Sequence, residues 1–155
     1  NEKHLLEIEK LYPDAVRFSA LLSIHSSQSN CLIIDNIGML SRLYKYSYIS
    51  YIGGGLKSSG IHNVLEAAVY NKVVVFGPYY KKYSEAVDLV KTGGGISFDD
   101  DKNDGAELKI VIEMLLKNQK EFIVRSTSAG DFVTSHKGAT QKILQFIQEN
   151  RLLTN

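Results

Sequence analysis

The sequence has few of the residues that mark several specialised protein classes. One of its 155 residues is cysteine, two are proline and none is tryptophan. A single cysteine, Cys31, excludes an internal disulfide framework and a metal site built from several cysteines. Two prolines and 12 glycines exclude a collagen-like or proline-rich chain. No apolar run reaches the roughly 18 residues of a membrane-spanning helix. We therefore expect a soluble globular chain.

Charge of neither sign dominates the chain. It carries 18 Lys and Arg residues against 17 Asp and Glu residues, a formal net charge of +1 at pH 7, and 44% of its residues are hydrophobic. This balance excludes a disordered polyelectrolyte and gives no support for a nucleic-acid partner. The length suffices for one domain with a sizeable core, which we assign to residues 1–155. Asn1 opens directly into a helical pattern, without an initiator Met or a signal peptide, which suggests a piece of a longer protein.

Short apolar runs typical of strands alternate with segments of helical periodicity. We predict strands near residues 16–18, 31–34, 48–52, 73–76 and 96–98, and helices within 5–12, 38–45, 86–90, 108–115 and 139–147, with a further helix from about residue 62. The runs CLII and VVVF are continuous because the strands of a parallel sheet are buried on both faces. The predicted fold is therefore α/β: a Rossmann-like parallel sheet with helices on both faces. Five strands are few for such a sheet, so we expect earlier strands to be missing before Asn1.

Residues 53–66, GGGLKSSGIHNVLE, carry the strongest indication of ligand binding. They are predicted to run from a strand through a glycine loop into a helix that begins near His62. Glycines let backbone N–H groups approach an anion, and a helix N-terminus adds unpaired donors and a partial positive charge. The pattern thus favours phosphate binding at the sheet edge where α/β folds bind ligands. The spacing matches neither the Walker motif nor GxGxxG.

A purely structural explanation of the same residues stays open. Asn63 followed three residues later by Glu66 is also a capping box, in which both side chains satisfy backbone donors. His62 then is a partly exposed residue before the cap, and the three glycines are an adaptable loop. For Asn63 and Glu66 taken alone, the sequence supports the structural and the functional explanation about equally. Their coincidence with a glycine loop at the ligand edge favours the functional one.

Residues at two other strand ends are weaker candidates. The Asp35 carboxylate could accept a hydrogen bond from a sugar hydroxyl or a base amino group. Asp35 and Asn36 are also residues that frequently begin a turn. The backbone of residues 38–40 lies at a predicted helix start, where a nucleobase could use it. Lys81 and Lys82 could meet a phosphate, although a lysine pair is more often a solvated surface. Nearby tyrosines could stack on a base but more often pack: Tyr79, Tyr80 and Tyr83.

Metal and covalent chemistry lack support in the sequence. The four histidines are scattered, with no pair at i, i+4 spacing: His4, His25, His62 and His136. No Ser-His-Asp order and no nucleophile elbow is present. Cys31 opens an apolar run and is expected in the core. We therefore expect no metal and no cofactor.

Taken together, these motifs resemble the carboxyl-terminal domain of 3-deoxy-D-manno-octulosonic acid (Kdo) transferases. The matching pieces are DNIG at 35–38, YIGG at 51–54, GIHNVLEAA at 60–68, VFGP at 75–78 and the glycines at 94–95. The combination of GGG, GxHNxLEAA and FGP is far more specific than any one piece. The resemblance covers most of the chain and is weakest over the first thirty residues. It implies the carboxyl-terminal half of a two-Rossmann-domain (GT-B) glycosyltransferase, without the amino-terminal acceptor domain.

The resemblance also implies roles for individual residues. The three glycines after residue 52 would line the site of the donor CMP-Kdo, His62 and Asn63 would lie near its phosphate, and Glu66 would accept from ribose hydroxyls. Gly38 and Met39 would contact cytosine through their backbones. The predicted donor-binding residues are Asp35, Gly38, Met39, Gly53, Gly54, Gly55, Gly60, His62, Asn63 and Glu66. Relatives often have an acidic residue at position 39 and Asn at position 82, so side-chain contacts of Met39 and Lys82 are not carried over.

The implied reaction transfers Kdo from CMP-Kdo to a lipid A precursor at the cytoplasmic face of the inner membrane. The general base is expected in the missing amino-terminal domain, so residues 1–155 alone should be inactive and should bind CMP weakly. Other expected partners are that missing domain and, through the full-length protein, the membrane surface. Two alternatives stay open: another GT-B enzyme that uses a UDP-sugar, and a non-catalytic nucleotide-binding module.

Overall fold

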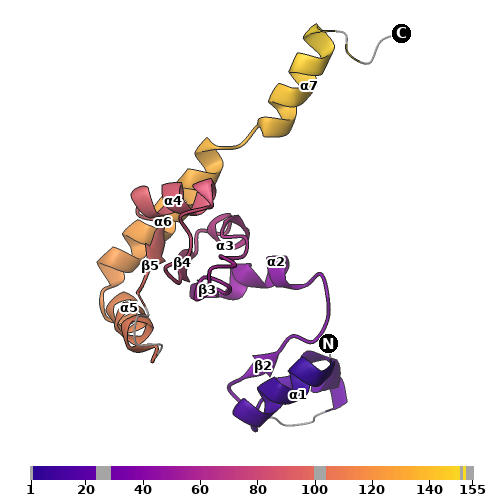
Figure 1. Cartoon of the computed structure of the whole chain (residues 1–155), viewed down its shortest axis with the longest axis vertical. Helices are drawn as coiled ribbons and strands as arrows, with labels where there is room; N and C mark the ends of the chain where they lie inside the picture. Colours follow the sequence, from indigo (N-terminus) through magenta and orange to yellow (C-terminus); the bar gives the residue numbers. More distant parts are fainter. Residues whose placement is uncertain (1, 24–28, 100–103, 151, 153–155) are drawn as a thin grey trace. The chain divides into compact units, whose positions relative to one another are not determined.

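The computed structural model of the chain describes residues 2–23, 29–99, 104–150 and 152, which form two compact units (Figure 1). The first unit is Asn1–Leu43 and the second is Tyr44–Asn155. The assignment of residues 1–155 to one domain stays a prediction.

The first unit is built around a two-stranded parallel sheet. Its elements are α1 (Glu2–Leu11), β1 (Val16–Arg17), the 3-10 helix η1 (Phe18–Ser23), β2 (Leu32–Ile33) and α2 (Leu40–Leu43). Val16 lies opposite Leu32. Arg17 ties the sheet to α1, because its guanidinium donates to Glu9 at 2.6 Å and to Glu2 at 2.8 Å. The hydrogen bond from Arg17 holds the pKa of Glu9 below its ordinary value.

The second unit is a three-stranded parallel sheet covered by helices. Its strands are β3 (Ile49–Ile52), β4 (Val73–Phe76) and β5 (Gly95–Ser97), in the order β3-β4-β5. Its helices are η2 (Tyr44–Tyr46), α3 (Leu65–Ala68), α4 (Ser84–Lys91), α5 (Ala106–Lys117), α6 (Gln119–Ser135) and α7 (Ala139–Glu149). The parallel α/β fold predicted from the sequence is confirmed.

The central strand β4 explains why its sequence is apolar without alternation. All four of its residues are completely buried. Val74 and Phe76 pack in one cluster with residues of α3, α4 and α6. Val73 and Val75 pack in a second cluster with residues of α5. Since successive side chains of a strand point to opposite faces, both faces of the sheet are covered, as the sequence predicts.

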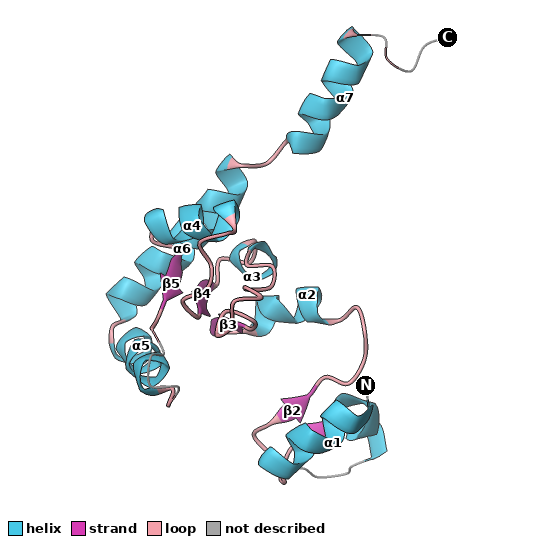
Figure 2. Ribbon diagram, viewed as in Figure 1, coloured by secondary structure: helices cyan, strands magenta, loops and turns pink. Residues whose placement is uncertain are grey.

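Two helical predictions need correction (Figure 2). The helix expected from His62 begins only at Leu65 and is four residues long. The longest helix of the second unit, α6, was not predicted at all. Its middle contains Ser126, Thr127, Ser128 and Gly130, which dilute the helical pattern. Tertiary packing maintains it, because Ala129 and Phe132 are buried against the sheet.

Helix α7 runs away from the sheet, and none of its residues is buried (Figure 1). Within the described residues, no helix has the length and apolarity needed to cross a bilayer.

Leu115 and Leu116 give a direct test of the second core cluster. Leu115 is fully buried, whereas its neighbour on α5 is 59% exposed. We expect Leu115→Ala to lower the free energy of unfolding by about 2–5 kcal/mol, because the lost methyl groups leave a cavity under β4. Leu116→Ala, the matched control, should lower it by less than about 1 kcal/mol. Urea unfolding followed by circular dichroism measures both; equal losses would show that the α5 packing described here is wrong.

Candidate functional site

The loop after β3, residues 53–60, is folded back by backbone hydrogen bonds. The carbonyl of Gly53 accepts from the amide of His62 at 3.1 Å, and the carbonyl of Gly54 accepts from the amide of Lys57 at 3.3 Å. Gly54 and Gly60 have φ angles of +90° and +86°, in the left-handed region that favours glycine. Within the described part of the chain, the amides of residues 53–55 donate to no other residue. The loop therefore uses its carbonyls internally, and its unpaired amides belong to the half-buried Gly53, the exposed Gly54 and the buried Gly55.

This loop touches the loop after β4. The amide of Tyr79 donates to the carbonyl of Gly55 at 3.0 Å. A Cβ added to Gly55 would lie 2.6 Å from the Ile61 side chain and 2.9 Å from the amide nitrogen of Gly77. The backbones of Gly55 and Gly77 can approach this closely only because neither residue has a side chain. Gly55 and Gly77 therefore have a packing role that joins the carboxyl ends of β3 and β4.

Tyr83 ties the tip of the same loop to the start of α4. Its hydroxyl donates to the carbonyl of Ser59 at 3.0 Å. A Cβ on Gly60 would collide with its ring. The ring also packs against the first core cluster, as Tyr80 does. The structural interpretation of these two tyrosines is thus confirmed, and Tyr83 in addition shapes the loop.

Residues 61–66 combine buried anchors with exposed polar side chains. Ile61 and Val64 are buried, while His62 and Asn63 are exposed. The Asn63 side-chain oxygen accepts from the amide of Leu65 at 3.0 Å, and its nitrogen donates to Glu66 at 3.3 Å. The capping-box prediction is therefore correct for Asn63, which accepts from a backbone amide. It is wrong for Glu66, which accepts from the Asn63 side chain and not from a backbone donor. Burial, and then the charge of Glu66, raise the pKa of Tyr44.

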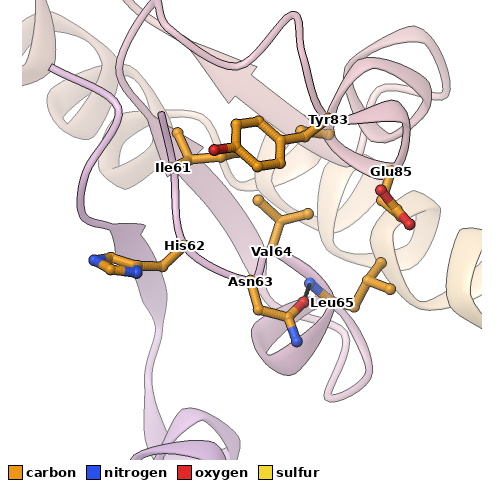
Figure 3. Close-up of a pocket in the computed structure, with 8 residues that line it drawn as sticks. Ile61, His62, Asn63, Val64, Leu65, Tyr83 and Glu85 are labelled. Carbon is orange, nitrogen blue, oxygen red and sulfur yellow. Dashed lines mark hydrogen bonds between the residues drawn. The ribbon is translucent and has the colours of Figure 1, made fainter. Parts of the chain in front are cut away.

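A pocket of about 410 Å³ lies beside this segment (Figure 3). Its lining residues are Ile61, His62, Asn63, Val64, Leu65, Tyr83, Glu85 and Ala86. In Figure 3 the His62 ring points away from Tyr83 and Glu85. The aliphatic side chains form an apolar surface for a ring, and the amide, hydroxyl and carboxylate groups can hydrogen-bond a sugar or a base. Glu85 was not singled out from the sequence; it lies in the first turn of α4, seven residues after Pro78.

The short α3 changes the electrostatic argument for anion binding. A four-residue helix has a much smaller dipole than the long helix predicted from His62, so the helix end contributes little. The amides of Gly53, Gly54 and Gly55 remain as the donors for an anion. Any capacity of this segment to bind an anion therefore depends on the loop more than on the helix.

The remaining predicted donor-binding residues belong to the first unit. Asp35 accepts from the amide of Ser19 at 3.1 Å and from the Ser19 hydroxyl. The hydroxyl bond is the main reason why the pKa of Asp35 lies below its ordinary value. Asn36 bonds Met39 through its side-chain nitrogen, and Gly38 has a φ angle of +90°. That Asp35, Gly38 and Met39 share a site with residues 53–66 stays a prediction.

The structure also shows where the single cysteine and the possible metal-ligating residue types lie. Cys31 is half-buried and lines a surface pocket of the first unit, so its placement in the core was wrong. Among the described residues, no group of three His, Cys, Asp or Glu residues could hold a metal ion. His25 lies outside the described residues.

Lys81 and Lys82 are exposed, as expected of a solvated lysine pair. They also line a second pocket, of about 370 Å³, together with Ser58, Pro78 and Tyr79. The sequence placed this lysine pair at the ligand edge but could not show that a pocket lies beside it.

Comparisons with known proteins agree with the resemblance seen in the sequence. No family model matches the chain. A bifunctional glycosyltransferase/methyltransferase of Fusobacterium nucleatum is 30% identical over 139 residues, 89% of this chain and 18% of that protein. A 3-deoxy-D-manno-octulosonic acid transferase of Aquifex aeolicus is 31% identical over 102 residues, 65% of this chain and 28% of that enzyme. This chain thus spans about a fifth to a quarter of these relatives.

A solved structure shares the fold. The crystal structure of the C-terminal CMP-Kdo binding domain of WaaA from Acinetobacter baumannii matches with a TM-score of 0.70 at 24% identity. The match covers 84% of this chain and 67% of that one. Together with the parallel sheet described above, it confirms the Rossmann-like α/β fold. The sequence resemblance to Kdo transferases is likewise confirmed.

The contact between the two glycine loops predicts different costs for neighbouring substitutions. Gly55→Ala should lower the free energy of unfolding by about 1–3 kcal/mol, because its Cβ would press on Ile61 and on the backbone of Gly77. Gly53→Ala is the control: the nearest atom to its Cβ, in the His62 ring, is 3.8 Å away, so it should change stability by less than about 1 kcal/mol. Denaturant unfolding compares the two, and a harmless Gly55→Ala would disprove the close approach.

The contact between Ser19 and Asp35 predicts a pH effect. The pKa of Asp35 lies below the ordinary 3.8, so the contact contributes stability above about pH 4, and this stability is lost as the pH falls through the folded-state pKa. Ser19→Ala should raise that pKa toward 3.8, as measured by carbon-detected NMR titration of the Asp35 carboxyl. Ser126→Ala, which changes a serine on α6 whose hydroxyl donates to the Ile123 carbonyl, should leave it unchanged. An unshifted Asp35 in Ser19→Ala would contradict the hydrogen bonds described.

Proposed function

We propose that this chain is the donor-binding part of a Kdo transferase and holds CMP-Kdo for transfer of Kdo to a lipid A precursor. The observation that carries the proposal is the position of His62 and Asn63, which line a pocket directly after the glycine loop. The similarity to the Aquifex enzyme and to the Acinetobacter CMP-Kdo binding domain supports it. The residue types match the needs of a nucleotide sugar: N–H donors for the phosphate, acceptors for hydroxyls and an apolar surface for a ring.

Within this proposal each part of the site has a task. The amides of Gly53, Gly54 and Gly55 bind the phosphate, and Gly60 gives the chain the turn it needs to reach residues 61–65. Glu66 accepts from the ribose hydroxyls, and Asn63 orients it through their hydrogen bond of 3.3 Å. Gly38 and Met39 are assigned to the cytosine, as the sequence resemblance implies, and Asp35 is assigned to a sugar hydroxyl or a base amino group because it follows a strand.

The chemical step breaks the bond between the Kdo anomeric carbon and the phosphate oxygen. Negative charge then grows on the departing CMP. Backbone donors that are already in place stabilise this charge without reorganising, which is an efficient form of transition-state stabilisation. The fixed loop, held by Gly55 and Tyr83, supplies such donors.

The rest of the reaction is assigned to other parts of the full-length protein. The proposal places there the acceptor site, the general base and the contact with the cytoplasmic face of the inner membrane. It includes no metal ion and no cofactor. An enzyme of the same architecture with a different nucleotide sugar is the second candidate, because the relative of Fusobacterium nucleatum is described only as a glycosyltransferase/methyltransferase.

Ligand titration by NMR tests the proposal on this chain. We expect CMP to bind more tightly than UMP or UDP, and Asn63→Ala with Glu66→Ala to weaken CMP binding at least ten-fold. Asn118→Ala is the control, because Asn118 caps α6 through the amide of Glu121 at 3.1 Å and lies outside the lining of the pocket. This control variant removes a comparable hydrogen bond from side chain to backbone, and its affinity for CMP should stay within two-fold of the wild-type value. Equal affinity for CMP and UMP would favour the second candidate.

A further inference from the structure

The second pocket differs chemically from the one beside His62. It is lined by Ser58 and by residues of the loop after β4, namely Pro78, Tyr79, Lys81 and Lys82. Both lysines are exposed, and Tyr79 is 53% exposed. The first pocket has a carboxylate, Glu85, in its lining, whereas the second has two cationic side chains. The second pocket therefore suits an anionic group next to a hydrophobic wall.

Lys81 and Lys82 differ in their ion pairing from three other lysines of the described residues. Lys91 forms an ion pair with Asp88, and Lys109 and Lys117 both form ion pairs with Glu113. Among the described residues, no carboxylate lies within ion-pair distance of Lys81 or Lys82. Two like charges on adjacent residues repel each other, and a bound anion relieves that repulsion.

This pocket is held at a fixed place relative to the glycine loop. Ser58 belongs to that loop, three residues after Gly55. The bond from the Tyr79 amide to the Gly55 carbonyl joins the two loops, and the bond from Tyr83 to Ser59 joins them again. A group attached directly to a phosphate at residues 53–55 is therefore within reach of this pocket.

We propose that Lys81 and Lys82 bind the carboxylate of the sugar acid in the donor, and so select an acidic sugar over a neutral one. The inference rests on the proposed function, which supplies the phosphate position. A sugar acid linked to CMP presents a second anion beside the phosphate, and ammonium groups in a pocket bind a carboxylate by charge-assisted hydrogen bonds. A neutral sugar offers no anion to these ammonium groups, so it lacks this part of the binding energy.

The experiment compares CMP with CMP-Kdo, freshly prepared by enzymatic synthesis, in NMR titrations of this chain. At neutral pH the CMP phosphate carries about −1.5 to −2 charges, and CMP-Kdo carries about −2 in total, so a general loss of positive charge affects both ligands alike. The test variant is Lys81→Gln with Lys82→Gln. The control variant, Lys120→Gln with Lys142→Gln, removes the same charge from exposed positions of α6 and α7.

We expect the test variant to bind CMP-Kdo at least ten-fold more weakly while its affinity for CMP changes less than two-fold. The control variant should match the wild type for both ligands, and Lys81→Arg with Lys82→Arg should restore most of the CMP-Kdo affinity. An equal loss for both ligands, or no loss for either, would overturn the carboxylate assignment and leave the proposed function standing. A wild-type chain that binds neither ligand would overturn both.

Discussion

The close approach of Gly55 and Gly77 is the contact on which the rest of the site depends. It joins the ends of two parallel strands through backbone atoms alone, since a Cβ on either residue would collide with the other loop. The bond from Tyr79 to Gly55 and the bond from Tyr83 to Ser59 lie on the same junction. The pocket beside His62 and the pocket beside Lys81 are lined by residues of these loops or of the segments that follow them. Packing thus requires glycine at positions 55 and 77, and the proposed ligand site depends on that packing.

The junction is rigid because the strands behind it are buried on both sides. β4 contributes Val74 and Phe76 to one core cluster and Val73 and Val75 to the other. No small shift of the strand is possible without opening a cavity on one face, because protein interiors are close-packed. The loop that follows such a strand starts from a fixed point. A fixed starting point is needed to hold a set of N–H donors in place before a ligand binds.

The strands and the parallel topology could be predicted because their signal is local. VVVF is a continuous apolar run, and a helix must follow a parallel strand. The start of α3 could not be predicted, because Ile61 and Val64 have helical spacing but lie before the helix, in a segment that the bond from the His62 amide to the Gly53 carbonyl ties to the glycine loop. Helix α6 was missed because its Ser, Thr and Gly residues weaken the pattern, and its buried contacts come from distant parts of the chain. The pairing of Asp35 with Ser19 and the pocket beside Lys81 likewise arise from tertiary contacts that no spacing reveals.

A crystal structure of this chain with CMP tests the central claim most directly. The account predicts the CMP phosphate within 2.7–3.2 Å of backbone nitrogens of Gly53, Gly54 or Gly55, the usual range for such hydrogen bonds. It also predicts the nucleoside against the pocket that His62 and Asn63 line. A phosphate bound at the pocket beside Cys31, or anywhere without contact to the loop after β3, would contradict it.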